Sequence, residues 1–260
     1  MTVVQALSIH EHGAGPAVVL VHGGAGPKTT WSGLHSLSAR WTLLLVHRRG
    51  FGASPPPPGG RQDFEIDADD LEGIFRDRRP HVVAHSYGVL GVLLAAARQP
   101  WTVRSLTLIE PPLYFLAPED PEVARLESLG NTVLTHGLDT DPAILREFLT
   151  LAGSPDGGGS RLSDPAVRRA WGARLPGQAR PNLTVMRAAG IPALVASGGH
   201  TPGLERICDL LADALGAQRL VTPGAGHFVP AAPGFADRLE EFLLSGTGTE
   251  SRGAQGADPD

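Results

Sequence analysis

HVVAHSYGVLGVLLAAA, residues 81–97, is the stretch that decides the fold. Its first residues, 81–84, form a short apolar run of the kind that becomes a buried β-strand. Small and polar residues at 85–88 interrupt the run, and an apolar helical pattern then continues to about Arg98. A strand that leads into a helix through so short a turn predicts one βα unit of a parallel sheet.

Five more apolar runs of similar length surround this unit. Each is followed by a Gly/Pro-rich turn or by a helical pattern. Runs that are apolar on both faces and alternate with helices indicate a parallel sheet covered on both sides. The predicted fold is therefore α/β, with a mostly parallel, doubly wound sheet. The five runs are residues 17–22, 42–47, 105–109, 192–197 and 218–222.

One long stretch breaks the alternation. Residues 111–189 contain helical patterns at 121–134 and 141–151 and no convincing strand, which predicts a helical lid inserted into a core made of residues 1–110 and 190–245. The Gly/Ser-rich segment 153–160 is expected to be flexible, and the tail 246–260 to be disordered. The apolar lid residues are expected mainly to pack on the core: Leu113, Tyr114, Phe115, Leu116, Trp171 and Met186.

Composition excludes several classes of function. The chain has 260 residues, 42% of them apolar, and a formal net charge of -5, so it offers no basic surface for nucleic acid. Cys208 is the only cysteine, which rules out an intrachain disulfide and fits a reducing cytoplasm. No run approaches the roughly 18 apolar residues of a membrane span. We expect a cytoplasmic protein with a small-molecule substrate, no cofactor, no metal and no membrane partner; its oligomeric state stays open.

The turn after the 81–84 run is a motif in its own right. Ala84-His85-Ser86-Tyr87-Gly88 resembles the G-x-S-x-G nucleophile elbow of the α/β-hydrolase superfamily, with alanine in place of the first glycine. Bulk at that position would collide with neighbouring backbone, and alanine is the smallest departure. The resemblance implies that Ser86 is the nucleophile, at a helix N-terminus that favours developing negative charge. The alternative is a plain helix N-cap serine.

The loop after the first long run supplies a second motif. HGGAGP, residues 22–27, resembles the HGG-type loop that provides one oxyanion donor in this superfamily. The resemblance implies Gly24 as the first choice of donor and Ala25 as the second, because glycines let the backbone approach a substrate closely. The other donor would be the backbone N–H of Tyr87. The alternative is an ordinary glycine-rich turn.

A third motif lies near the C-terminus. VTPGAGHF, residues 221–228, follows one predicted strand and precedes an amphipathic helix over 235–244, and it resembles the histidine loop of the family. The resemblance implies that His227 takes the proton of Ser86 and returns it to the leaving group. The alternative is a surface histidine.

The acid of the expected triad departs from the common pattern. Residues 192–202 resemble the strand and turn where many relatives carry aspartate, but Thr201 stands at that position. Glu110 follows the run 105–109, where some relatives, including certain haloalkane dehalogenases, place their acid. The resemblance therefore assigns the acid to Glu110. The alternative is a carboxylate that caps or orders the start of the lid.

Two polar clusters are interpreted as scaffold. HRRGFGAS, residues 47–54, resembles the D-x-R-G-x-G-x-S turn of the superfamily with histidine in place of aspartate, and Arg49 is expected to shape that turn. Asp67, Asp69 and Asp70 begin a helix, where acidic residues suit the helix dipole. A solvated first turn is favoured over a metal cluster.

The resemblance implies a serine hydrolase that cleaves a small-molecule carboxylic ester, lactone or thioester through an acyl-enzyme on Ser86. Serine at the elbow argues against dehalogenases and epoxide hydrolases, which use aspartate, and leaves a peroxide-using perhydrolase open. The alternative, motivated by Thr201, is a non-hydrolytic cyclase or small-molecule binder with a vestigial triad. An interaction module would explain the sheet but not the three motifs at residues 22–27, 84–88 and 221–228.

Overall fold

A computed structural model describes residues 6–152 and 163–247. Its seven strands form a sheet in the order β1-β3-β2-β4-β5-β6-β7, in which β1 pairs antiparallel with β3 and every other pair is parallel. The predicted α/β fold is confirmed. The strands are β1 (Ile9–His12), β2 (Ala17–Val21), β3 (Thr42–Val46), β4 (His81–His85), β5 (Ser105–Ile109), β6 (Ala193–Ser197) and β7 (Gln218–Val221).

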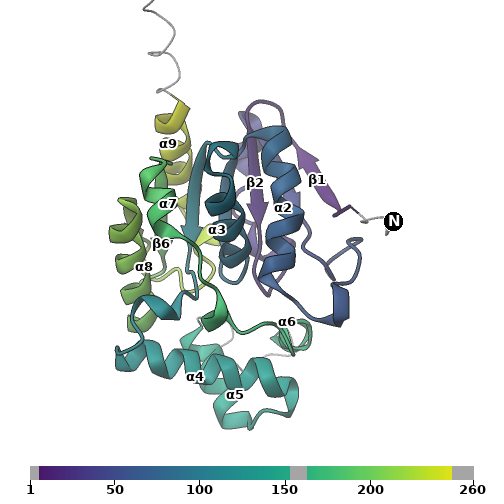
Figure 1. Cartoon of the computed structure of the whole chain (residues 1–260), viewed down its shortest axis with the longest axis vertical. Helices are drawn as coiled ribbons and strands as arrows, with labels where there is room; N and C mark the ends of the chain where they lie inside the picture. The colour runs from purple at the N-terminus through teal and green to yellow at the C-terminus, as the bar shows by residue number, and fades with distance from the viewer. Residues whose placement is uncertain (1–5, 153–162, 248–260) are drawn as a thin grey trace, which may run out of the picture.

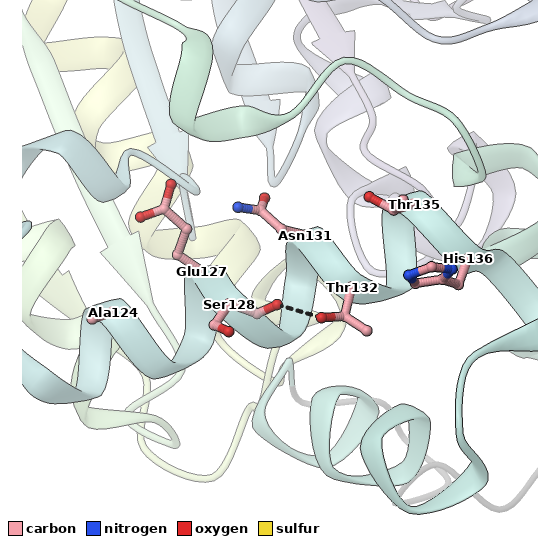
Figure 2. Close-up of a pocket in the computed structure, with 7 residues that line it drawn as sticks. All are labelled: Ala124, Glu127, Ser128, Asn131, Thr132, Thr135 and His136. Atoms are coloured by element: carbon pink, nitrogen blue, oxygen red, sulfur yellow. Dashed lines mark hydrogen bonds between the residues drawn. The ribbon is translucent and has the colours of Figure 1, made fainter.

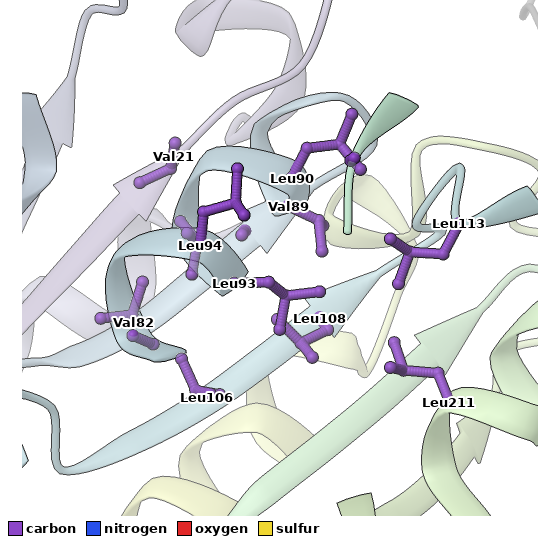
Figure 3. Close-up of a cluster of buried hydrophobic side chains, with 14 of the residues drawn as sticks. Val21, Val82, Val89, Leu90, Leu93, Leu94, Leu106, Leu108, Leu113 and Leu211 are labelled. Atoms are coloured by element: carbon purple, nitrogen blue, oxygen red, sulfur yellow. The ribbon is translucent and has the colours of Figure 1, made fainter. Parts of the chain in front are cut away.

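The two faces of the sheet are both buried. In β2, Val19 and Val21 belong to one apolar cluster, whereas Val18 and Leu20 belong to a second cluster on the opposite face. Figure 3 shows part of the first cluster, where leucines of the helix after β4 lie over the side chains of β4 and β5. The α-helices that contribute to the first cluster are α2 (Phe64–Arg78), α3 (Gly88–Arg98), α4 (Pro121–His136), α7 (Leu183–Ala188) and α8 (Pro202–Leu215). The second cluster is covered by η1 (His35–Ala39), α9 (Phe235–Thr247) and the tryptophans Trp31 and Trp41.

Strand β1 was not predicted. Its sequence, IHEH, is polar, and three of its four residues are exposed, because the strand pairs on one side only, with β3. An edge strand of this kind carries no apolar run from which it could be found.

A set of helices separates β5 from β6, and Figure 1 shows α4 and α5 together at one end of the molecule. Asp120 and Asp141 begin these two helices by accepting backbone N–H groups of their first turns. The Thr201 hydroxyl, after β6, donates to the carbonyl of Leu151 at 2.5 Å, which ties the end of α5 to the sheet. The helices are η4 (Tyr114–Leu116), α4 (Pro121–His136), η5 (Gly137–Asp139), α5 (Pro142–Leu151), α6 (Ser163–Ala170), η6 (Pro176–Gln178) and α7.

The remaining short helices are α1 (Pro27–Thr30), η2 (Pro58–Gly60), η3 (Pro100–Thr102) and η7 (Val229–Ala231). Leu113, Tyr114 and Met186 pack in the core, whereas Trp171 is 59% exposed. The segment 153–160 and residues 248–260 lie outside the described residues, and α9 continues to Thr247, into the predicted tail. No helix in the described part of the chain is long and apolar enough to span a bilayer.

Candidate active site

Ser86 lies in a strained turn between β4 and α3. Its φ is 54°, in the left-handed region that residues other than glycine rarely adopt. The Ser86 amide donates to the carbonyl of Ile109 at 2.8 Å, and its carbonyl accepts from Val89 at 2.9 Å. Gly88 is required here, because a Cβ at that position would lie 2.5 Å from the carbonyl oxygen of His22. The turn therefore has the tight geometry that the elbow motif predicts.

The loop after β2 lies directly against this turn. A Cβ placed on Gly23 would stand 2.7 Å from the Cβ of Ser86 and 3.2 Å from its Oγ. Only glycine fits at such an approach. The half-buried residues Gly24 and Ala25 come next along the loop, so the structure brings both predicted donors close to the turn that carries Ser86.

Arg48 contacts the loop 22–27, and the sequence analysis did not predict this contact. Its guanidinium is buried and donates to the carbonyls of His22 at 3.4 Å and Gly23 at 3.3 Å. A trans peptide directs its C=O and N–H in opposite directions. Because the Gly23 carbonyl points to Arg48, the Gly24 amide points away from it, and this amide donates to no acceptor among the residues described.

The same guanidinium is anchored by two further side chains. It donates to Asp67 at 3.0 Å and to Gln62 at 2.6 Å. The predicted solvated helix turn is therefore wrong for Asp67, which is 4% exposed, and for Asp70, which accepts two hydrogen bonds from Arg49. Burial raises the pKa of Asp67, although the neighbouring guanidinium of Arg48 opposes that shift. Asp69 is exposed, as expected.

Tyr87 follows Ser86 and is fixed from two sides. The guanidinium carbon of Arg48 lies 5.0 Å from the centre of its ring, and its hydroxyl donates to the carbonyl of Arg174 at 2.9 Å. The Tyr87 amide donates to no acceptor in the described residues. It stands at the N-terminus of α3, where free N–H groups favour negative charge.

Glu110 is fully buried at the end of β5, and it too has a left-handed backbone, with φ of 50°. Its amide donates to the carbonyl of Ala196 at 3.0 Å, and its Oε1 accepts from the amide of Gly198 at 2.7 Å. Its Oε2 accepts from Nδ1 of His227 at 3.0 Å. Burial raises the pKa of Glu110. The structure thus brings together the two side chains that the sequence assigns to acid and base.

His227 also lies against the elbow. Its carbonyl accepts from Nε2 of His85 at 2.8 Å, and the two rings stand 4.4 Å apart. Burial and the neighbouring His200 lower the pKa of His227, so its imidazole is neutral near pH 7. A neutral ring that donates from Nδ1 has its lone pair on Nε2. No hydrogen bond joins Ser86 to His227 within the described residues.

His200 is a second histidine at the same carboxylate, and the sequence analysis missed it because only a carboxylate was sought there. Its Nδ1 lies 3.7 Å from Oε1 of Glu110, and its ring stands 6.4 Å from that of His227. Both ring nitrogens are buried without a hydrogen-bond partner in the part of the chain described. Glu110, His200 and His227 offer ligand atoms within 4.8 Å of one another, a set that could hold a metal ion.

A separate hollow of about 460 Å³ lies along α4 and contains none of the predicted site residues. Figure 2 shows Glu127 and Asn131 pointing to the same side of this helix. The hollow is lined by Ala124, Glu127, Ser128, Asn131, Thr132, Thr135 and His136. It is polar and shares no residue with the elbow, so we place the candidate active site at Ser86 instead.

Comparison with known proteins agrees with this fold. The model of the alpha/beta hydrolase fold family matches residues 16–231, and the chain therefore belongs to that family. A carboxylesterase structure from Nitrososphaera gargenis has a TM-score of 0.67 at 17% identity, covering 94% of this chain and 96% of that one. A thermophilic esterase from Thermogutta terrifontis has a TM-score of 0.63 at 20% identity, covering 94% and 93%.

Similarity in sequence to curated proteins is restricted to part of the chain. The 2-(acetamidomethylene)succinate hydrolase of Mesorhizobium japonicum is 35% identical over 108 residues, which are 40% of this chain and 38% of that protein. The probable lysophospholipase BODYGUARD 1 of Arabidopsis thaliana is 31% identical over 107 residues, 37% of this chain and 23% of its own length. The chain thus matches well under half of each of these relatives.

Proposed function

We propose that the chain is a serine hydrolase that cleaves small-molecule carboxylic esters, lactones or thioesters through an acyl-enzyme on Ser86. The observation that carries the proposal is the 3.0 Å hydrogen bond from His227 Nδ1 to the buried Glu110. It sets the tautomer in which Nε2 can accept a proton, on a loop that contacts His85, the residue before the strained Ser86.

The proposed reaction uses these groups in turn. Ser86 Oγ attacks the carbonyl carbon while His227 Nε2 takes its proton. The amides of Gly24 and Tyr87, with Ala25 as the second choice for the loop donor, bind the oxyanion. His227 then protonates the leaving group, and a water molecule activated by the same imidazole releases the acyl group and restores Ser86. Glu110 stabilises the imidazolium that forms in each half-reaction.

Residues 111–189 would act as the lid, and one of their side chains indicates a substrate class. The guanidinium carbon of Arg169, on α6, lies 4.9 Å from the ring centre of Phe51, which packs on the His22 ring at 4.4 Å and stands beside Gly26. The ring of Phe51 therefore lies between the Arg169 guanidinium and the loop 22–27. We infer that Arg169 binds an anionic group of the substrate.

The surroundings of Arg169 support that inference. Its Nε is buried without a hydrogen-bond partner in the described residues, and burial lowers its pKa. A partly buried cation with no anion is unfavourable, and a carboxylate would satisfy it with two parallel hydrogen bonds. The relative from Mesorhizobium japonicum is named for a succinate derivative, which carries carboxylates.

The rival function is a cyclase or binder with a vestigial triad, and the missing hydrogen bond between Ser86 and His227 favours it. Such bonds are often long in free enzymes and shorten when substrate binds. The test is turnover of a panel of p-nitrophenyl esters by the wild type, Ser86→Ala and Glu110→Gln, with labelling by a fluorophosphonate.

Loss of turnover and labelling in Ser86→Ala, with a reduction of roughly ten-thousand-fold in Glu110→Gln, is the expected result. A wild-type protein that neither turns over any ester nor reacts with the fluorophosphonate would overturn the proposal in favour of the binder or cyclase. Wild-type rates in Glu110→Gln would remove the assignment of the acid.

A further inference from the structure

We propose that Glu110, His200 and His227 form a zinc site, and that Zn²⁺ bound there switches the hydrolase off. The inhibitory half of this inference rests on the proposed function, whereas the binding half does not. The three residues come from different loops, after β5, β6 and β7, which the sheet brings to one edge.

His200 is the observation that points to a ligand. A buried polar atom normally has a hydrogen-bond partner, and an unpaired one calls for an explanation. Both nitrogens of His200 are buried without such a partner among the described residues, although Nδ1 stands only 3.7 Å from the Glu110 carboxylate. The ring therefore presents a nitrogen lone pair or an N–H to the Glu110–His227 pair without completing a hydrogen bond.

The geometry suits zinc. Zinc sites use bonds of about 2.0–2.2 Å to nitrogen and carboxylate oxygen in tetrahedral arrangement, which places neighbouring ligand atoms about 3.3 Å apart. His227 Nδ1 lies 3.0 Å from Oε2 of Glu110 and His200 Nδ1 lies 3.7 Å from Oε1, so the two imidazoles approach the two oxygens of one carboxylate at distances on either side of that value. The three ligand atoms are within 4.8 Å of one another, so the side chains of His200 and His227 would have to draw together around the ion.

The donor set also selects among metals. Two imidazoles and one carboxylate are the ligands of open, four-coordinate zinc sites, in which the fourth position is taken by water. Mg²⁺ and Ca²⁺ prefer oxygen ligands and larger coordination numbers. The side chains of His200 and His227 are each 15% exposed, which leaves a path for an ion from solvent.

Zinc bound here would stop acyl transfer through the tautomer of His227. The ion takes the lone pair of Nδ1, so the single proton of the neutral ring moves to Nε2. Nε2 is the atom that must accept the Ser86 proton, and in this tautomer it has no lone pair to do so. The ion also occupies the carboxylate of Glu110, which can no longer stabilise an imidazolium. Binding releases no proton from either ring; it exchanges one tautomer for the other.

The test combines metal binding with inhibition. Full-length protein is freed of metal with a chelator, titrated with Zn²⁺ in a calorimeter, and examined with Co²⁺, whose visible absorption reports four-coordinate binding. His200→Asn removes one ligand, and His35→Asn, an exposed histidine outside the site, is the matched control. Ser86→Ala keeps all three ligands.

The expected result is one Zn²⁺ per chain, reversible inhibition of ester turnover, and no inhibition by Mg²⁺. His200→Asn should bind Zn²⁺ at least about tenfold more weakly and require a correspondingly higher concentration for inhibition, whereas His35→Asn should match the wild type. Ser86→Ala should bind Zn²⁺ as tightly as the wild type, although it is inactive.

Equal zinc affinity in wild type and His200→Asn would overturn the site, as would wild-type protein that binds neither Zn²⁺ nor Co²⁺. His200→Gln provides a second variant if His200→Asn unfolds. A protein that hydrolyses no ester but binds Co²⁺ through His200 would refute the proposed function and leave the metal site standing, so the two failures are distinguishable.

Discussion

Replacing Arg48 with methionine tests whether this side chain aims the oxyanion donor. The guanidinium donates to the carbonyls of His22 and Gly23, which turns the amide of Gly24 to the opposite side of its peptide. Without those donors the Gly23 carbonyl keeps only its contact with Nδ1 of His22, at 2.8 Å, so the Gly24 amide is held less firmly. One oxyanion donor is worth roughly 100- to 1,000-fold in kcat. We therefore expect Arg48→Met to lower kcat by up to that factor, with little change in KM.

Stability must be separated from catalysis in this experiment. The side chains of Arg48 and Asp67 are 2% and 5% exposed, so the single substitution leaves a buried carboxylate without its cation. Such a loss costs about 3–5 kcal/mol of folding free energy. In the double variant Arg48→Met, Asp67→Leu both charges are gone, and replacing a buried ion pair by apolar residues is often neutral. This variant should fold and still lack the donors.

The assay is steady-state turnover of a p-nitrophenyl ester beside urea unfolding of each variant. The expected pattern is an unstable single variant, a double variant within about 2 kcal/mol of the wild type, and low kcat in both. A stable double variant with the wild-type kcat would refute the reasoning, because the Gly24 amide would then be oriented without Arg48.

Two further predictions concern basic side chains whose pKa is lowered by burial. Burial lowers the pKa of His85 and His227 to about 3 and that of His22 well below its ordinary value, so the unfolded chain binds more protons below pH 6.5 and folding stability falls as pH falls. Three such histidines predict a loss of up to about 4 kcal/mol between pH 7 and pH 5.5 in urea unfolding. The raised pKa values of Asp67 and Glu110 act in the opposite sense. Equal stability at the two pH values would contradict this prediction. Arg169→Gln should lower kcat/KM at least about tenfold for an ester with a carboxylate in its acyl group, and should change it little for the neutral ester. The adjacent residue Arg168 is exposed, and Arg168→Gln should change kcat/KM for neither ester. Equal losses on the two esters in Arg169→Gln would contradict the anion-binding role.

The strands that could be predicted are those buried on both faces. An interior strand such as β4 is buried on both faces and apolar through its middle, at Val82, Val83 and Ala84, so its position is visible in the sequence. The elbow was visible for a related reason, because Ser86 follows such a run and a small residue is needed at Gly88. Strand β1 satisfies neither condition, since solvent covers most of its side chains.

The network around Arg48 could not be predicted in the same way. Its partner Asp67 is 19 positions away and looks like one of several acidic residues in a solvated first helical turn. Whether a carboxylate is exposed or buried depends on which side of the helix faces the sheet, and the acidic pattern at Asp67, Asp69 and Asp70 does not contain that information. The structure shows that Asp69 is exposed and pairs with Arg98 at the surface, whereas Asp67 and Asp70 pair with the buried Arg48 and Arg49.

The position of Glu110 explains how a chain with Thr201 can still present a carboxylate to His227. Strands β5 and β6 are neighbours, and Glu110 leaves β5 with a left-handed backbone that donates its amide to Ala196 of β6. The carboxylate then reaches the Gly198 amide, so it occupies the end of β6, where an acid of that strand would stand. The acid is therefore not needed at Thr201, and the Thr201 hydroxyl instead donates to the carbonyl of Leu151 at the end of α5. The acid is thus displaced by one strand in the sequence while its contact with the imidazole is kept.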